Sequence, residues 1–247
     1  QGIAYAARLL GMDATIVMPS DAPTIKRQGT AAQGARIREY DRATESREQI
    51  AEEIAAVTGA VLVPAFDDLD VMAGQGSCGV ELIDQLRSLG AAPDALLCPV
   101  GGGGLMAGVA TAVKGLAASC AVLGVEPEHY DDHLRSRIAG ERVKITPPAS
   151  TACDSLMATM PGELTWAVNS TLVDRFLSVS EDEVAHAVSF AFRYLKLVVE
   201  PGGAVGLAAL LSSKAALPAG SSVAVILSGG NIDPAGHASA LRLHPEP

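Results

Sequence analysis

The sequence predicts an α/β protein in which two series of βαβ units each surround a parallel sheet. The chain of 247 residues is 49% hydrophobic but only 4% aromatic, a composition typical of helices packed on parallel strands. Short apolar stretches alternate with longer stretches of helical periodicity. A run of glycines at 101–104 separates one apolar stretch from a helical one. These observations together favour strands and helices that alternate along the chain.

The first series of elements ends at Pro64. We expect helices and strands in alternation, with helices at 1–10, 22–32 and 46–58 and strands at 14–18, 35–40 and 60–63. Gly59 closes the third helix, and Pro64 ends the third strand. The aspartate-rich stretch 65–70 then predicts a crossing between domains. We therefore expect the remainder of a smaller domain in residues 1–64 and a larger, ligand-binding domain in residues 65–247.

The second series follows the same pattern. We expect helices at 71–89, 105–116 and 204–211, and strands at 95–98, 121–125 and 223–227. Ser180 and Glu183 have the spacing of a capping box, which predicts that another helix begins there. Residues 140–150, which include Pro147 and Pro148, indicate a loop.

Charge and cysteine content argue against several function classes. The formal net charge is −10 and no basic run exceeds Lys26-Arg27, so nucleic acid is not expected as a partner. No apolar run approaches the roughly 20 residues that span a bilayer, and residues 1–10 form an amphipathic helical pattern rather than a signal peptide. The four cysteines are far apart and lack CxxC spacing, which predicts reduced thiols in a cytoplasmic protein.

The glycine run is the clearest functional signal. It leaves successive backbone N–H groups uncovered at the start of a helix, where negative charge is favoured, and so predicts a phosphate-binding loop. Gly102, Gly104 and Ala107 also fit the G-x-G-x-x-G/A dinucleotide fingerprint, and Glu126 ends the next strand where a ribose-binding acid is expected. The loop alone therefore leaves open a nicotinamide cofactor, another phosphorylated ligand, or a turn that binds nothing.

A second glycine segment, Ser228-Gly229-Gly230-Asn231, follows the last predicted strand. Open α/β sheets bind ligands at the carboxyl ends of their parallel strands. A hydroxyl group beside glycines suits the nitrogen of a planar heteroaromatic ring, which a dinucleotide half does not require. The segment by itself is also compatible with a simple turn, but together with the first loop it favours a heteroaromatic phosphate over a dinucleotide.

Several motifs in a fixed order resemble those of fold-type II pyridoxal phosphate enzymes, in particular the serine/threonine dehydratase and serine racemase group. They are Ala-Gly-Gln-Gly at 73–76, Val-Gly-Gly-Gly-Gly-Leu at 100–105, Val-Glu-Pro at 125–127, Val-Glu-Pro-Gly-Gly-Ala at 199–204 and Leu-Ser-Gly-Gly-Asn at 227–231. The resemblance runs from Gln1 to about Ala240. It implies two parallel-sheet, three-layer domains of the tryptophan synthase β-like kind, with the small domain incomplete, and a homodimer.

The resemblance also assigns roles to residues of the two glycine segments. It implies that the cofactor phosphate is bound by the N–H groups of Gly101, Gly102, Gly103, Gly104 and Leu105. Ser228, with Gly229 beside it, is implied to hydrogen-bond the pyridine nitrogen. Arg47 matches a residue that contacts a substrate carboxylate in relatives of the serine racemase kind, a task that suits a guanidinium group. Its helical position equally permits a surface salt bridge.

The resemblance further implies a cation site that follows the strand at 121–125. Glu126, Asp132 and the backbone carbonyl of Tyr130 match positions that bind Mg²⁺ or Ca²⁺ in several relatives, and oxygen ligands suit these hard cations. Two alternatives stay open. One is a zinc pair formed by His129 and His133, provided that one helix carries both. The other is a solvated acidic helix start without a ligand.

The activity that the resemblance implies is α,β-elimination from a β-hydroxy amino acid to a 2-oxo acid and ammonia, as in threonine or serine dehydratase. Phe-Asp-Asp at 66–68 resembles the dehydratase version of the domain crossing, whereas Ser155 stands where relatives usually have glycine. The alternatives are a serine racemase or a dehydratase for another hydroxy amino acid, such as hydroxyaspartate, phenylserine or a hydroxyectoine-derived substrate.

The covalent anchor of the cofactor is missing from this sequence. In the family that it resembles, the cofactor-binding lysine and a Ser-Ser-Gly-Asn-His segment precede the position that Gln1 matches, and no lysine here matches that one. We therefore expect the natural protein to be longer and this chain alone to be inactive. Ser228 is the catalytic candidate that the chain retains.

Overall fold

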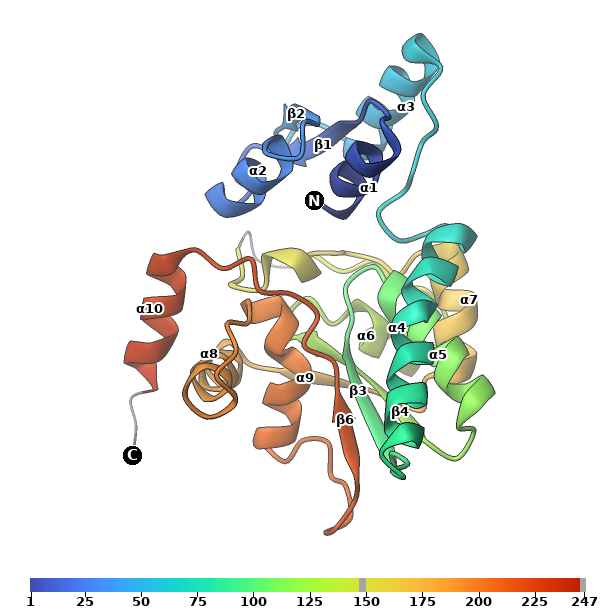
Figure 1. The fold of residues 1–247 in the computed structure, drawn as a ribbon, viewed down its shortest axis with the longest axis vertical. Helices are drawn as coiled ribbons and strands as arrows, with labels where there is room; N and C mark the ends of the chain where they lie inside the picture. Colours follow the sequence, from blue (N-terminus) through green and yellow to red (C-terminus); the bar gives the residue numbers. More distant parts are fainter. Residues whose placement is uncertain (147–149, 245–247) are drawn as a thin grey trace. The chain divides into compact units, whose positions relative to one another are not determined.

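The computed structural model of the protein describes residues 1–146 and 150–244 (Figure 1). The chain forms two compact units. One comprises Gln1–Val63 with Asn231–Ala235, and the other comprises Pro64–Gly230 with the residues from Gly236 onward. Residues 140–146 lack regular helix or strand from Glu141 on, whereas Pro147 and Pro148 of the predicted loop lie outside the described residues.

The first unit is a two-stranded parallel sheet with helices. β1 (Thr15–Pro19) and β2 (Arg36–Tyr40) pair from Thr15 opposite Arg36 to Pro19 opposite Tyr40. The helices are α1 (Gly2–Leu10), α2 (Thr24–Ala31) and α3 (Arg47–Thr58). Ser46 begins α3, because its hydroxyl accepts the Gln49 N–H at 3.2 Å and satisfies a donor that has no partner within the helix. The alternation predicted for residues 1–58 is present.

The strand predicted at 60–63 is wrong. These residues are irregular, and Val61 is 85% exposed. A strand needs a neighbour whose N–H and C=O groups complete its hydrogen bonds. Within the described residues of this unit, β1 and β2 pair with each other and no other strand lies beside residues 60–63. The apolar character of the segment predicted burial, but the segment has no partner strand to bury it.

The second unit contains a parallel sheet with the strand order β5-β4-β3-β6. Its strands are β3 (Ala95–Pro99), β4 (Ala121–Pro127), β5 (Arg175–Val179) and β6 (Val223–Val225). β3 lies at the centre, with Leu96 opposite Val122 on one side and Ala224 on the other. Every residue of β3 is buried, which explains its uninterrupted apolar sequence.

Helices cover both faces of this sheet, giving three layers (Figure 1). The helices are α4 (Leu69–Ser88), α5 (Gly104–Leu116), α6 (Asp132–Ala139), α7 (Glu163–Leu172), α8 (Glu181–Phe190), α9 (Pro201–Leu211) and α10 (Pro234–Leu243). Figure 1 shows α4, α5 and α7 on one side of the strands and α8 and α9 on the other. The core between α5 and the sheet contains Met106, Val109 and Val113 against Leu96 and Val122.

The capping box at the start of α8 is confirmed. Ser180 Oγ accepts the Glu183 N–H at 3.3 Å, and Glu183 Oε2 accepts the Ser180 N–H at 2.7 Å. By contrast, α7 and β5 were not expected from the sequence. The carboxylate of Asp67 caps α7 from a distant part of the chain, by accepting the N–H groups of Glu163, Leu164 and Thr165. Because this cap is not local, the sequence around residue 163 gave no starting signal for the helix.

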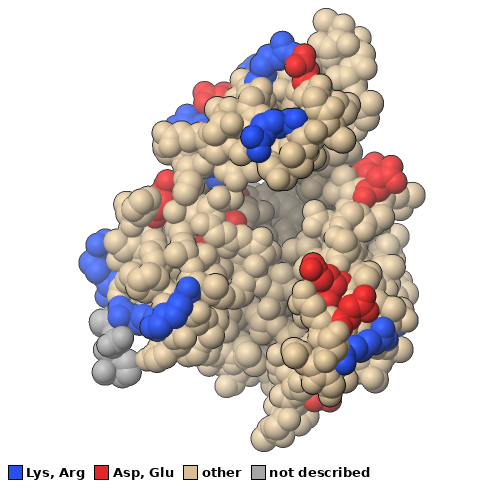
Figure 2. Space-filling model, viewed as in Figure 1, with Lys and Arg blue, Asp and Glu red and all other residues tan. Residues whose placement is uncertain are grey.

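Helix hydropathy, surface charge and the cysteines concern the classes of protein that the sequence argues against, namely membrane-spanning, nucleic-acid-binding and disulfide-linked proteins. No helix in the described part of the chain is long and apolar enough to cross a membrane. On the face drawn in Figure 2, the Lys and Arg side chains lie in small, separate groups among acidic ones. The four cysteines are free thiols, and Cys98, Cys120 and Cys153 are buried.

Candidate active site

The glycine loop joins the carboxyl end of β3 to the start of α5. Gly103 takes the position before the first turn of the helix, with φ 97°, a left-handed conformation that favours glycine. Among the described residues, no acceptor receives a hydrogen bond from the N–H groups of Gly101, Gly102, Gly103, Gly104 or Leu105. A helix of 13 residues adds its positive end to these free donors. The loop therefore has a geometry that suits a phosphate group, and its binding of one stays a prediction.

The loop is packed too closely for side chains. A Cβ atom on Gly102 would overlap the ring of Phe66, and one on Gly103 would lie 2.7 Å from both Asn169 Nδ2 and His133 Nε2. The glycines thus serve two needs, because they expose the N–H groups on one side and admit neighbouring side chains on the other. A phosphate group fits a row of free N–H groups of this kind.

Residues of α7 hold the loop from behind. Thr165 Oγ1 donates to the Gly102 carbonyl at 2.7 Å, and Asn169 Nδ2 donates to the Gly103 carbonyl at 3.1 Å. Asp67 fixes α7 in turn through its cap on the first turn of that helix. The roles of Asp67, Thr165 and Asn169 were not predicted from the sequence, because each depends on contacts between residues more than 60 positions apart.

Ser228 lies at the same edge of the sheet. It follows β6, the strand that pairs with β3, and Ile226 N–H extends this pairing by donating to the Leu97 carbonyl at 3.0 Å. Ser228 is exposed. The next residue is fixed by α9, because the Glu200 N–H donates to the Gly229 carbonyl at 2.9 Å. The loop and Ser228 thus follow neighbouring parallel strands, where such sheets bind their ligands.

The dinucleotide alternative fails at Glu126. A ribose-binding acid must present its carboxylate to the ligand, but Glu126 is fully buried. Its two oxygens accept the N–H groups of His133 and Leu134, each at 2.8 Å. Glu126 therefore caps α6 from the end of β4 instead of facing the glycine loop's open side.

Arg47 is in the first unit. It occupies the first turn of α3, and its Nη2 lies 2.5 Å from Oε1 of the neighbouring Glu48. The structure thus shows the surface salt bridge that the sequence allowed. A role toward a substrate carboxylate stays a prediction.

The candidate cation site consists of buried side chains. Glu126, Asp132 and His133 each offer one ligand atom, and these atoms lie within 4.8 Å of one another. Tyr130 is buried in the turn before α6. Both alternatives left open by the sequence are wrong. His129 is exposed, has φ 71° and precedes the helix that carries His133, so the two do not share a helix face. Asp132 is fully buried, so the helix start is not solvated.

Burial and mutual contact shift the protonation of this cluster. Burial raises the pKa of Glu126 to about 7 and also raises the pKa of Asp132 above its ordinary value. Burial alone would lower the pKa of His133, but the neighbouring carboxylates of Asp132 and Glu126 raise it to about 9. The cluster therefore favours a positive charge between the two carboxyl groups.

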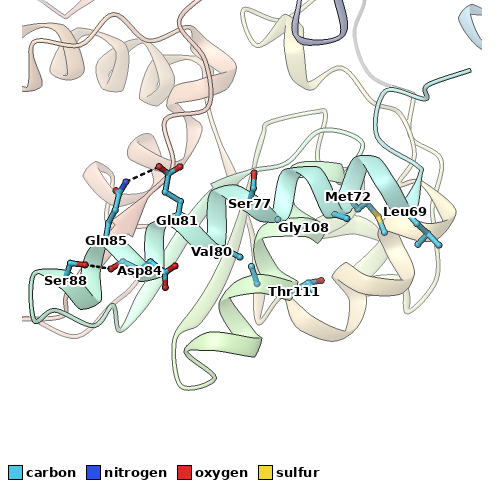
Figure 3. Close-up of a pocket in the computed structure, with 13 residues that line it drawn as sticks. Leu69, Met72, Ser77, Val80, Glu81, Asp84, Gln85, Ser88, Gly108 and Thr111 are labelled. Atoms are coloured by element: carbon cyan, nitrogen blue, oxygen red, sulfur yellow. Dashed lines mark hydrogen bonds between the residues drawn. The ribbon is translucent and has the colours of Figure 1, made fainter. Parts of the chain in front are cut away.

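A separate groove runs along α4 and α5 (Figure 3). It has a volume of about 950 Å³. Leu69 and Met72 line one end, and the other end is polar, with the hydrogen bond from Gln85 to Glu81 drawn in Figure 3. None of the predicted site residues lines the groove. The residues that suit a phosphorylated ligand lie instead at the carboxyl edge of the sheet.

Comparison with known proteins identifies the family of this chain. Residues 1–229 match the family described as pyridoxal-phosphate dependent enzyme. The chain is 43% identical over 233 residues to L-threo-3-hydroxyaspartate ammonia-lyase of Saccharomyces cerevisiae, covering 94% of this chain and 70% of that protein. It is 37% identical over 235 residues to serine racemase of Rattus norvegicus, covering 94% and 69%.

Solved structures of a threonine deaminase and of a serine racemase are also similar to this chain. The processed form of threonine deaminase isoform 2 from Solanum lycopersicum is similar with a TM-score of 0.88 and 32% identity, covering 99% of this chain and 70% of that one. Maize serine racemase is similar with a TM-score of 0.85 and 36% identity, covering 99% and 74%. These similarities confirm the predicted fold class and the resemblance drawn from the glycine motifs.

Proposed function

The chain belongs to the pyridoxal-phosphate-dependent enzyme family, and from this premise we propose an ammonia-lyase that acts on a β-hydroxy amino acid, with threonine and serine as its substrates. The reaction removes the Cα proton and the β-hydroxyl group, and hydrolysis of the remaining carbon–nitrogen bond releases a 2-oxo acid and ammonia. For threonine the 2-oxo acid is 2-oxobutanoate. The observation that carries the proposal is the row of free N–H groups in the glycine loop, at the same sheet edge as Ser228.

The residues of this chain bind and orient the cofactor. When bound, pyridoxal phosphate withdraws electrons from Cα and so acidifies its hydrogen. The N–H groups of Gly101, Gly102, Gly103, Gly104 and Leu105 hold the phosphate, and the positive end of α5 stabilises its charge. Because Thr165 and Asn169 fix the loop carbonyls, the donors are held in place before the ligand arrives.

Ser228 favours elimination because its hydroxyl group is uncharged. A hydroxyl group that hydrogen-bonds the pyridine nitrogen does not hold a proton there, as a carboxylate would. A ring whose nitrogen is not protonated would draw less negative charge from Cα, which would favour loss of the β-hydroxyl group over transamination. The phosphate group held by the glycine loop would supply an acidic group near that hydroxyl.

Hydroxyaspartate is a second candidate substrate. The ammonia-lyases from Saccharomyces cerevisiae and from Pseudomonas sp. that are named for L-threo-3-hydroxyaspartate are both 43% identical to this chain. Ser155 could contribute to such a preference, because its Oγ occupies the space directly beside Gly202 at the start of α9. The product from this substrate would be oxaloacetate.

The test uses the full-length natural protein loaded with pyridoxal phosphate. L-threonine, L-serine and L-threo-3-hydroxyaspartate are supplied separately, and 2-oxo acid release is followed with lactate or malate dehydrogenase. Chiral chromatography measures D-serine formed from L-serine in the same samples. We expect 2-oxo acid to exceed D-serine, and the substrate with the highest kcat/KM decides between the two candidates. Faster formation of D-serine than of 2-oxo acid would overturn the lyase proposal in favour of a racemase.

Two further predictions belong to this proposal. A cytoplasmic location is expected from the free thiols, and a homodimer is expected from the resemblance. Arg47→Met tests the predicted contact with the substrate carboxylate. If Arg47 makes that contact, the variant raises KM more than it lowers kcat.

A further inference from the structure

We infer that Ser155 is a further ligand-binding residue of the glycine-loop site, and that its hydroxyl group donates a hydrogen bond to pyridoxal phosphate bound there. The inference rests on the proposed function, because it requires the cofactor to extend from the glycine loop to Ser228. It adds a second side-chain hydroxyl group to a site in which Ser228 and backbone N–H groups are the other proposed donors.

Ser155 belongs to a short turn that lies between two glycine segments. The turn is the 3₁₀-helix η1 (Asp154–Leu156). A Cβ atom on Gly101, the first residue of the glycine loop, would lie 3.4 Å from the Ser155 carbonyl oxygen. A Cβ atom on Gly202, in the first turn of α9, would overlap Ser155 Oγ. Ser155 therefore lies directly against both the glycine loop and the start of α9.

The first turn of α9 extends this contact to the other end of the site. A Cβ atom on Gly203 would lie 2.7 Å from the carbonyl oxygen of Gly229, the residue after Ser228. The Glu200 N–H donates to the same carbonyl at 2.9 Å. Contacts thus run from the glycine loop through Ser155 and α9 to Gly229. A ligand with its phosphate at the loop and its ring nitrogen at Ser228 has Ser155 beside the part that joins these two ends.

The hydroxyl group of Ser155 is available to a ligand. Ser155 is exposed, although the next residue, Leu156, is buried. Within residues 1–146 and 150–244, Ser155 Oγ forms no hydrogen bond. A serine hydroxyl can rotate to donate its proton to an acceptor on the ligand. Glycine, which relatives usually have at this position, offers no such donor.

The backbone on both sides of Ser155 is fixed by the rest of the fold. The Ala152 N–H donates to Oε1 of Glu181, the first residue of α8, at 3.2 Å. The Leu156 N–H donates to the Cys153 carbonyl at 2.8 Å. A backbone that is already ordered reduces the conformational entropy lost when the hydroxyl group bonds a ligand. The position of Ser155 is therefore set before the ligand binds.

The experiment titrates pyridoxal phosphate into the full-length protein after its cofactor has been removed, and follows cofactor absorbance and fluorescence. Ser155→Ala and Ser155→Gly should each weaken cofactor affinity about fivefold, the effect of one neutral hydrogen bond. Both should also shift the absorption maximum of the bound cofactor. Ser155→Thr keeps the hydroxyl group and should bind with the affinity and the absorption maximum of the unaltered protein.

The control is Ser119→Ala, because Ser119 is an exposed serine in the turn before β4, at the opposite edge of the sheet. Its affinity for the cofactor should not change. Unchanged affinity and absorption in Ser155→Ala and Ser155→Gly would overturn the inference. A lower free energy of unfolding in urea with unchanged affinity would show that the side chain only fills space beside Gly202. Tighter binding by Ser155→Gly would also overturn the inference, because the side chain would then crowd the cofactor.

The variant Gly103→Ala, measured in parallel, separates this inference from the proposed function. If Gly103→Ala loses affinity and Ser155→Ala does not, the phosphate loop stands and the role of Ser155 falls. If neither variant loses affinity, the phosphate loop itself is contradicted, and the inference on Ser155 falls with it.

Discussion

The residues that follow two neighbouring strands of the larger unit differ in how far their polar groups are satisfied. β3 leads into a loop whose backbone N–H groups have no acceptor among the described residues. β4 leads into Glu126, whose carboxylate oxygens accept the N–H groups of His133 and Leu134, and His133 lies within ion-pair distance of both Glu126 and Asp132. The polar groups after β3 are thus available to a ligand, whereas those after β4 are largely satisfied within the fold.

The largest effect is expected on cofactor affinity when the glycine loop that carries the unpaired N–H groups is altered. Gly103→Ala introduces a Cβ at a left-handed position and within 2.7 Å of Asn169 and His133. We expect pyridoxal phosphate affinity of the full-length protein to fall by about 100-fold, which equals about 2.7 kcal/mol. Cofactor absorbance during titration measures the affinity. Gly115→Ala is the control in the same helix, since a Cβ there meets nothing within 4 Å. Equal affinity in both variants would contradict the proposed phosphate loop.

A second effect concerns the support behind the loop. Asp67→Ala removes the carboxylate that accepts the N–H groups of Glu163, Leu164 and Thr165. We expect the free energy of unfolding to fall by about 2 kcal/mol, the upper end for loss of a helix cap. Urea denaturation measures it, with Asp84→Ala on the surface of α4 as the control, for which about 0.5 kcal/mol or less is expected. A similar small loss for Asp67→Ala would show that α7 does not depend on this cap.

A smaller effect is expected at Ser228. Ser228→Ala removes the hydroxyl group predicted to bond the pyridine nitrogen, and we expect affinity for pyridoxal phosphate to fall about tenfold, or about 1.4 kcal/mol. Ser228→Asp instead introduces a carboxylate that holds a proton on that nitrogen, so the ratio of elimination to transamination should fall. Product analysis by chromatography measures this ratio. An unchanged ratio in the Asp variant would show that Ser228 does not act on the ring.

The smallest effect is expected on the pH dependence of stability at Glu183. This residue caps a helix, as Glu126 does, but it lies at the surface. Partial burial of Glu183 acts to raise its pKa, but the hydrogen bond from Lys214 and the backbone N–H of Ser180 lower it below its ordinary value. A lowered folded-state pKa stabilises the fold above the unfolded value, and this contribution is lost as pH falls through the folded value.

Unfolding followed from pH 6 downward should therefore show a weaker loss of stability in Glu183→Gln than in the unaltered protein. Lys214→Met, which removes the partner charge, should change the profile in the same direction. A variant profile parallel to that of the unaltered protein would show that the cap does not contribute to acid sensitivity.

The sequence by itself determined the alternation of strands and helices, the glycine loop and the capping box of Ser180 and Glu183. These features depend on neighbours in the chain: apolar periodicity, a residue that tolerates positive φ, and a hydroxyl three positions from a carboxylate. The motif at 227–231 also indicated the cofactor class, because strand ends that pair in a parallel sheet share one edge.

Only the tertiary structure decided the rest. Residues 60–63 are apolar like a strand but have no described partner strand. α7 begins where Asp67 reaches it from a distant part of the chain, and His133, not His129, joins Glu126 because α6 begins at Asp132. In each case the deciding contact joins groups whose separation is set by the sheet and its helices. Local sequence does not specify that separation, because burial and hydrogen-bond partners depend on the whole fold.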